Sequence, residues 1–271
     1  MKAFYITEPG KTEIKKIKEP EPQSDEILLK IKKVGLCGSD LNTFRGKNPL
    51  VSFPRIPCHE VAGEVIAIGK DVPAYIKTGM TTTVSPYTNC GKCPACRNKR
   101  PNACQFNQTL GVQRDGALKE YICVPWEKIY FSAKLSEEEL TLVEPFSVGF
   151  HAVERGEITQ KDTVAVLGCG SIGVGVIAAA VQKKAKVIAV DIDDNKLNLV
   201  KKIMPEVTTI NSRLQNLHKI LSDITNAGPD VIIEAIGLPI TFRVAVEEVA
   251  FTGRVVYIGY AKDPTTYETK M

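Results

Sequence analysis

A glycine-rich turn near the middle of the chain places the strongest constraint on the fold. Gly168, Gly170 and Gly173 form G-C-G-S-I-G between the apolar strand pattern TVAVL and the helical pattern IGVGVIAAA. In this context the first glycine allows a tight turn, the second lets a pyrophosphate approach the backbone, and the third lets the helix pack on the strand. The helix N-terminus offers free N–H groups to the phosphates. The motif predicts a dinucleotide site, with a ligand-free glycine turn as the plainer alternative.

Other candidate cofactor contacts lie in and after this turn. Asp191 ends the next strand pattern, near the offset of about 20 residues expected for the ribose-binding acid. Its carboxylate would accept a ribose 2′-hydroxyl and repel a 2′-phosphate, which favours NAD over NADP. Ile172 lies within the turn.

The chain changes character near residue 145. Residues 1–135 contain short strand patterns separated by Pro and Gly clusters, whereas later apolar runs such as KVIAVD and DVIIEAIG alternate with helical patterns. Continuous apolar strands alternating with helices predict a parallel sheet covered on both faces. We therefore expect a β-rich domain over 1–145 and an α/β domain over 146–271. The 44% apolar and 24% charged composition is that of a globular protein, which excludes disorder, collagen and a coiled coil.

Charge and apolar patterning exclude several classes of partner. The net charge of +4 is too small for a protein that binds nucleic acid or a membrane through electrostatics. No apolar run approaches the ~20 residues of a membrane helix, and MKAFYITEPGKTEIKK lacks the apolar centre of a signal peptide. We therefore expect a cytoplasmic protein with neither partner. In a reducing compartment, its eight cysteines favour metal binding or catalysis over disulfides.

Four of these cysteines have the spacing of a metal site. Cys90, Cys93, Cys96 and Cys104 form C-x2-C-x2-C-x7-C. Four thiolates on one short loop can close a tetrahedral shell around zinc and leave no open position, so the site should be structural. Free surface thiols and an iron–sulfur cluster are the alternatives. A nucleic-acid zinc ribbon also fits the spacing, although the surrounding charge is mixed.

A second candidate set combines different ligand types. Cys37 lies in VGLCGSD, His59 and Glu60 lie in IPCHEVAGEV, and Glu144 lies in LVEPFSVGFHA. A thiolate, an imidazole and a carboxylate make a three-ligand zinc site that keeps a fourth position for water or substrate. Each residue alone has a structural explanation: a buried cysteine, a core histidine or a helix-capping glutamate.

The order of these motifs resembles the zinc-dependent medium-chain dehydrogenases, over essentially the whole chain. The branch that includes sorbitol, L-threonine and L-galactonate dehydrogenases is most similar, through GLCGSD, PRIPCHEVAGEV, the four-cysteine segment, GVQRDGALKEY, VEPFSVGFHAVERG and GCGSIG. The resemblance implies a GroES-like catalytic domain over 1–145, followed over 146–271 by a Rossmann doubly wound parallel sheet. It implies two zinc ions per chain, one catalytic and one structural, together with NAD. A full-length fold of this kind implies a homo-oligomer, a dimer or a tetramer.

The resemblance also assigns roles to individual residues. It makes Cys37, His59 and Glu144 ligands of the catalytic zinc, with Glu60 as a ligand or an acid just outside the shell. Ser39 matches the hydroxyl that relays a proton from the zinc-bound oxygen to solvent; a serine that only shapes the turn is the alternative. Asp40 could hydrogen-bond a ligand from outside the metal shell. Lys196, five residues after Asp191, matches a basic residue near the adenosine ribose, and a solvated lysine on a helix face explains it equally well.

The expected reaction is oxidation of a small-molecule alcohol, at a secondary hydroxyl of a polyol or sugar acid, by hydride transfer to NAD. L-threonine or butanediol dehydrogenase is the alternative within enzymes, because pockets differ by few side chains. A truncated, non-catalytic remnant that binds zinc and NAD is the alternative outside them.

Three departures from the family pattern matter. Cys58 stands where the family usually has glycine, so the backbone there should want a glycine conformation, and its thiol could lie beside the metal. Asn42 replaces a histidine of the proton relay and cannot carry a proton. The chain is also shorter than its family, so the second domain is expected to be incomplete at its C-terminal end.

Overall fold

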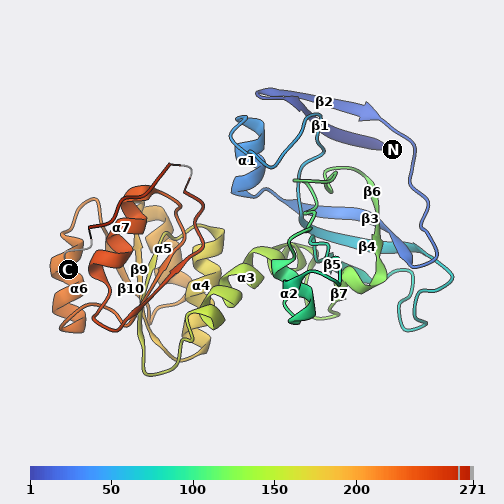
Figure 1. The fold of residues 1–271 in the computed structure, drawn as a ribbon. Coiled ribbons are helices and arrows are strands. Elements are labelled where there is room, and N and C mark those ends of the chain that lie inside the picture. The colour runs from blue at the N-terminus through green and yellow to red at the C-terminus, as the bar shows by residue number, and fades with distance from the viewer. Residues whose placement is uncertain (262, 269–271) are drawn as a thin grey trace. The chain divides into compact units, whose positions relative to one another are not determined.

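The chain divides after Glu144 into two structural units, Met1–Glu144 and Pro145–Met271, in a computed structural model that describes residues 1–261 and 263–268 (Figure 1). The division falls inside a helix, α3, just before its internal Pro145. Within the described residues, no helix is long and apolar enough to cross a membrane.

The first unit is built mainly from short antiparallel strands. Its elements are β1 (Lys2–Glu8), β2 (Lys11–Lys16), β3 (Glu26–Gly35), α1 (Gly38–Phe44), β4 (Glu60–Ile68), β5 (Thr81–Val84), α2 (Pro94–Arg97), η1 (Pro101–Ala103), β6 (Tyr121–Pro125), η2 (Trp126–Lys128), β7 (Ile129–Phe131) and the start of α3 (Glu137–Arg155).

One five-stranded sheet, in the order β6-β3-β4-β5-β7, organises this unit, and β1 and β2 form a separate hairpin (Figure 1). Ile27 and Leu29 alternate along β3 with more exposed residues and are fully buried, which is the pattern of a sheet with one face on a core. They belong to a core cluster that includes Val61 and Val65 of β4. The pairing of Gly35 with Glu60 brings the end of β3 next to the start of β4.

The second unit alternates strands and helices. Its elements after α3 are β8 (Thr163–Leu167), α4 (Ser171–Gln182), β9 (Lys186–Asp191), α5 (Asp194–Ile203), β10 (Thr208–Asn211), α6 (Leu217–Thr225), β11 (Val231–Glu234), α7 (Pro239–Glu248) and β12 (Arg254–Tyr257).

These strands form a parallel sheet in the order β10-β9-β8-β11-β12. Val164 and Val166 of β8 face a core cluster that contains α4 and α5, while Ala165 and Leu167 face a cluster that contains α6 and α7. The sheet is therefore covered on both faces, which explains its continuous apolar strands. The strand order reverses at β8, and in such sheets ligands bind beyond the carboxyl ends of the strands at this point.

Candidate metal and dinucleotide sites

Cys37, His59 and Glu60 come together in the first unit. Cys37 follows β3 and precedes α1, and the other two begin β4, the neighbouring strand. The cysteine sulfur, an imidazole nitrogen and a carboxylate oxygen lie within 4.8 Å of one another. A Cβ at Gly35 would clash with the Glu60 carboxylate, so only glycine leaves room for this side chain. Thiolate, imidazole and carboxylate are the donors that zinc takes in proteins.

The surroundings of this cluster favour a positive charge. Burial works against a charged imidazole, but the hydrogen bond with the Cys37 sulfur and the charge of nearby Glu144 outweigh it and raise the pKa of His59 to about 9. Burial also raises the pKa of Glu60, against the opposing charge of His59. The buried Nδ1 of His59 has no hydrogen-bond partner among the described residues. The residues present therefore fit a bound cation.

Asp40 connects the two segments that carry these ligands. Its buried carboxylate accepts a hydrogen bond from the backbone N–H of Cys37 through Oδ2 and another from that of Cys58 through Oδ1, both at 2.9 Å. Asp40 thus holds the backbone next to Cys37 and His59. Nearby, the Oγ of Ser39 is buried and has no hydrogen-bond partner among the described residues.

Cys58 has the glycine-like backbone conformation that the family resemblance predicts. Its φ is 77°, in the left-handed region that favours glycine. Gly111 and Gly116 pack against this backbone, and a Cβ on Gly111 would come within 2.8 Å of the Cys58 nitrogen. The thiol is buried, and burial raises its pKa. Its sulfur is not part of the three-ligand group.

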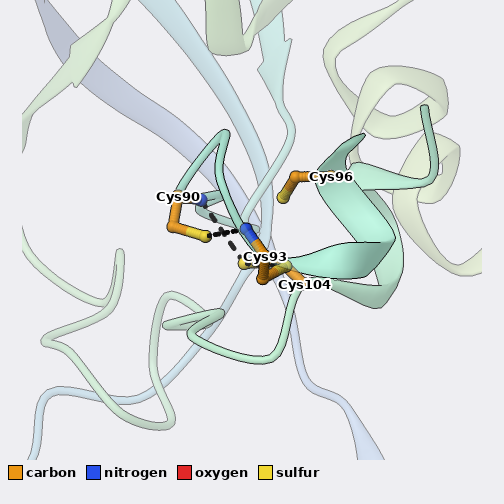
Figure 2. Close-up of side chains that lie close together, drawn as sticks. All are labelled: Cys90, Cys93, Cys96 and Cys104. Atoms are coloured by element: carbon orange, nitrogen blue, oxygen red, sulfur yellow. Dashed lines mark hydrogen bonds between the residues drawn. The ribbon is translucent and has the colours of Figure 1, made fainter. Parts of the chain in front are cut away.

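The four cysteines of the second predicted metal site also converge. The sulfurs of Cys90, Cys93, Cys96 and Cys104 lie within 4.8 Å of one another. Figure 2 shows them gathered between the loop that begins at Cys90 and the short helix that carries Cys96. The N–H groups of Cys90 and Cys93 donate to the sulfurs of Cys104 and Cys90, each at 3.3 Å.

Main-chain donors in this loop favour the thiolate of Cys93, whereas burial raises the pKa of Cys96 to about 11. Hydrogen bonds from the backbone N–H groups of Cys96 and Gln105 lower the pKa of Cys93 to about 6. Gly91 supplies a positive φ of 72° for the turn, and Pro94 opens α2. Four thiolates arranged in this way fit a closed zinc site.

The glycine turn of the second unit has the geometry of a phosphate-binding loop. Gly168 has a φ of 97°, and a Cβ on Gly173 would clash with the Gly168 carbonyl oxygen. By contrast, a Cβ on Gly170 would meet no atom within 4 Å, so this glycine faces open space at the start of α4. Ile172, in the first turn of α4, is half-buried. Two glycines serve the turn and its packing, while Gly170 leaves room for a ligand.

Asp191 fixes the turn from the neighbouring strand. Its carboxylate accepts hydrogen bonds from the backbone N–H groups of Cys169, Ile192 and Asp193 at 2.7–3.0 Å. Burial works against the charge, but these main-chain donors and Lys196 lower the pKa of Asp191 below its ordinary value. The Lys196 ammonium lies 3.6 Å from the carboxylate.

Family models match most of the chain. The alcohol dehydrogenase GroES-like domain matches residues 23–134, and the zinc-binding dehydrogenase model matches residues 171–271. A sorbitol dehydrogenase of Bacillus subtilis is 35% identical over 96% of this chain and 75% of its own length. An L-galactonate-5-dehydrogenase of Escherichia coli is 37% identical over 70% of this chain and 56% of its own length.

The chain belongs to the zinc-dependent medium-chain dehydrogenases. A solved structure described as a short chain alcohol dehydrogenase (rspB) from E. coli CFT073, complexed with NADH, matches with a TM-score of 0.92 at 29% identity. The match covers 100% of this chain and 79% of the chain in the solved structure. The family and the fold class expected from the sequence are thus confirmed. The expected cofactors, zinc and a nicotinamide dinucleotide, are also those indicated by the family model and by the NADH in the solved structure.

Within this family framework, two residues absent from the sequence analysis stand out. Tyr87 lies three residues after the end of β5. Its hydroxyl donates a hydrogen bond to Glu144 Oε1 at 2.6 Å. Glu234, at the end of β11, is fully buried and accepts hydrogen bonds through Oε1 from Ile236, Gly237 and Thr241 at 2.7–2.9 Å. Its loop packs on Gly168, since a Cβ there would lie 2.7 Å from Ile236.

The structure does not bring all the predicted zinc ligands into one group. Glu144 is buried and its charge acts on His59 and Glu60, but it is not in the group within 4.8 Å. Its role as a zinc ligand stays a prediction. No signal in the sequence pointed to Tyr87, because nothing local pairs it with a residue so far along the chain.

Proposed function

We propose that this chain oxidises a secondary hydroxyl of a polyol or sugar acid and passes the hydride to NAD. The convergence of Cys37, His59 and Glu60 carries the proposal, because three donors of the type zinc prefers meet at the ends of two paired strands. A zinc ion bound there would supply a Lewis acid that makes a substrate hydroxyl easier to deprotonate. The family and the polyol and sugar-acid dehydrogenases among its relatives support this substrate class.

The residues of this chain then have separate tasks. Cys37, His59 and Glu60 would hold the metal. The Ser39 hydroxyl, whose Oγ has no hydrogen-bond partner among the described residues, would accept the proton of the substrate hydroxyl as it gives its own proton to water. Asn42 cannot carry that proton further, so it leaves through water. In the second unit, Gly170 and the N-terminus of α4 receive the pyrophosphate, and Asp191 receives the ribose hydroxyls and disfavours a 2′-phosphate. The four-cysteine loop holds a second, structural zinc.

The first test is the zinc content of the purified protein. We expect two zinc ions per chain, measured by elemental analysis without added metal. Cys37→Ser and Cys104→Ser should each leave one, because each removes a ligand from a different site. Cys123→Ser, which changes a strand cysteine outside both groups, should retain two and is the control.

The same variants identify the reaction. NAD reduction is followed with sorbitol, L-galactonate, L-threonine and 2,3-butanediol. We expect turnover with a polyol or the sugar acid that is lost in Cys37→Ser and retained in Cys123→Ser. A wild-type chain that holds only one zinc, and keeps that zinc in Cys37→Ser, would refute the catalytic site. Turnover of L-threonine or butanediol alone would refute the proposed substrate class.

A further inference from the structure

Two buried glutamates lie near the proposed zinc site, but only one belongs to it. Glu60 and Glu144 are each 6% exposed. The charge of Glu144 raises the pKa of both His59 and Glu60, so the three side chains lie close together. Only the Glu60 carboxylate lies within 4.8 Å of both the Cys37 sulfur and a His59 nitrogen. The chemistry of the carboxylates is identical, so their surroundings must distinguish them.

The Tyr87 hydroxyl provides that distinction. It lies 2.6 Å from Glu144 Oε1, which is a short distance for a hydroxyl donating to a carboxylate, and such charge-assisted bonds are strong. Tyr87 is half-buried, and a tyrosine hydroxyl holds its proton at neutral pH. The hydroxyl therefore remains a donor, and its hydrogen bond occupies an oxygen that could otherwise turn to a metal.

The consequence for the metal shell follows from ligand number. A catalytic zinc holds three protein ligands and keeps a fourth position open, whereas four protein ligands close the site. With Cys37, His59 and Glu60 in place, a second carboxylate would take the position that a substrate hydroxyl needs.

We propose that Tyr87 is a positioning residue that holds the Glu144 carboxylate away from the metal and so keeps the substrate position open. This inference rests on the proposed function, since it needs zinc at Cys37. It assigns Glu60 as the third protein ligand of the metal.

The test uses Tyr87→Phe in the full chain, because this change removes the hydroxyl and keeps the ring. The released Glu144 should then bind the zinc as a fourth ligand. We expect zinc transfer to the chelator 4-(2-pyridylazo)resorcinol from the Cys37 site to slow by about 10-fold, because a fourth ligand must then dissociate, and this is the order of magnitude by which groups around a metal change its affinity. The transfer phase of the four-cysteine site is identified with Cys37→Ser. Turnover should fall by a similar factor.

A double variant separates positioning from a general loss of structure. In Tyr87→Phe/Glu144→Gln, zinc transfer should return to the rate of Glu144→Gln alone, because the amide is a poor zinc ligand. Tyr130→Phe, at an exposed tyrosine of β7, is the matched control and should leave the rate unchanged. If Tyr87 had only a structural role, Tyr87→Phe would speed the loss of zinc. Faster zinc transfer, or an unchanged rate, would overturn this inference and leave the proposed function intact. A wild-type chain without zinc at Cys37 would overturn the proposed function as well.

Discussion

At the scale of single residues, Cys58 shows how the site tolerates an unfavourable backbone. A non-glycine residue at a φ of 77° costs roughly 1–2 kcal/mol, because Cβ crowds the carbonyl oxygen. The Asp40 carboxylate binds its N–H, and its carbonyl accepts the N–H of Ala117 at 2.9 Å. Both backbone groups are therefore satisfied in this conformation, which holds the neighbouring His59 in place.

Alanine usually makes a protein more stable than glycine at the same position, and substitutions at Cys58 should invert that order. We expect Cys58→Gly to be more stable than Cys58→Ala by about 1 kcal/mol, since both lose the thiol and only alanine keeps the Cβ strain. Thermal unfolding of the two variants measures the difference. At Cys123, in the extended strand β6, alanine should instead exceed glycine by ~0.5–1 kcal/mol. The same order at both positions would show that the conformation of Cys58 carries no strain.

At the scale of elements, Asp191 joins the end of β9 to the turn after β8. Three backbone N–H groups converge on its carboxylate, and these bonds need the ionised form. Its pKa is lowered in the folded chain, so its contribution to stability is present above the ordinary pKa of about 4 and is lost as the pH falls through the lower folded value.

Asp191→Asn should reveal this contribution through its pH dependence. The amide nitrogen cannot accept the hydrogen bond that Oδ2 accepts from Cys169, so the variant should unfold at a lower temperature than the wild type at pH 7. The difference should remain constant down to about pH 4 and shrink below it, as the wild-type carboxyl takes up its proton. Calorimetry between pH 3 and pH 7 measures both proteins. A difference that grows on acidification would contradict this assignment.

At the scale of the whole molecule, each structural unit has its own core and its own candidate ligands. The core cluster of the first unit lies between residues 27 and 129, and the two clusters of the second lie between residues 152 and 245. Both candidate metal groups belong to the first unit, and the glycine turn belongs to the second. Metal and dinucleotide should therefore stabilise different parts of the chain.

Hydrogen exchange should locate the two effects. Adding NADH should slow amide exchange at 168–173 and 191–193, where backbone N–H groups form the turn and bind Asp191. Removing zinc with a chelator should speed exchange at 90–104, because Cys93 and Cys104 are the buried apolar residues of that loop. The buried strand β3, probed at Ile27 and Leu29, serves as the control for chelation. Unchanged exchange at 168–173 with NADH would contradict dinucleotide binding at the turn.

Sequence and structure agree best where the chemistry is local. The four cysteines lie within one loop, and the glycine turn follows its strand directly, so spacing alone determines which atoms can meet. Even the positive φ of Cys58 was accessible, because the family has glycine at that position and glycine marks such a backbone.

What the sequence by itself determined is the family and the fold class, together with which cysteines and glycines share a loop, since these depend on neighbouring residues and on the order of short motifs. The tertiary structure alone decided which acid lies beside Cys37 and which accepts the hydrogen bond of Tyr87. Glu60 joins Cys37 because β3 pairs with β4, and Glu144 meets Tyr87 because α3 brings a residue 57 positions away to the end of β5. Such contacts follow from how elements pack, and no local pattern encodes which of two identical carboxylates will receive the hydrogen bond.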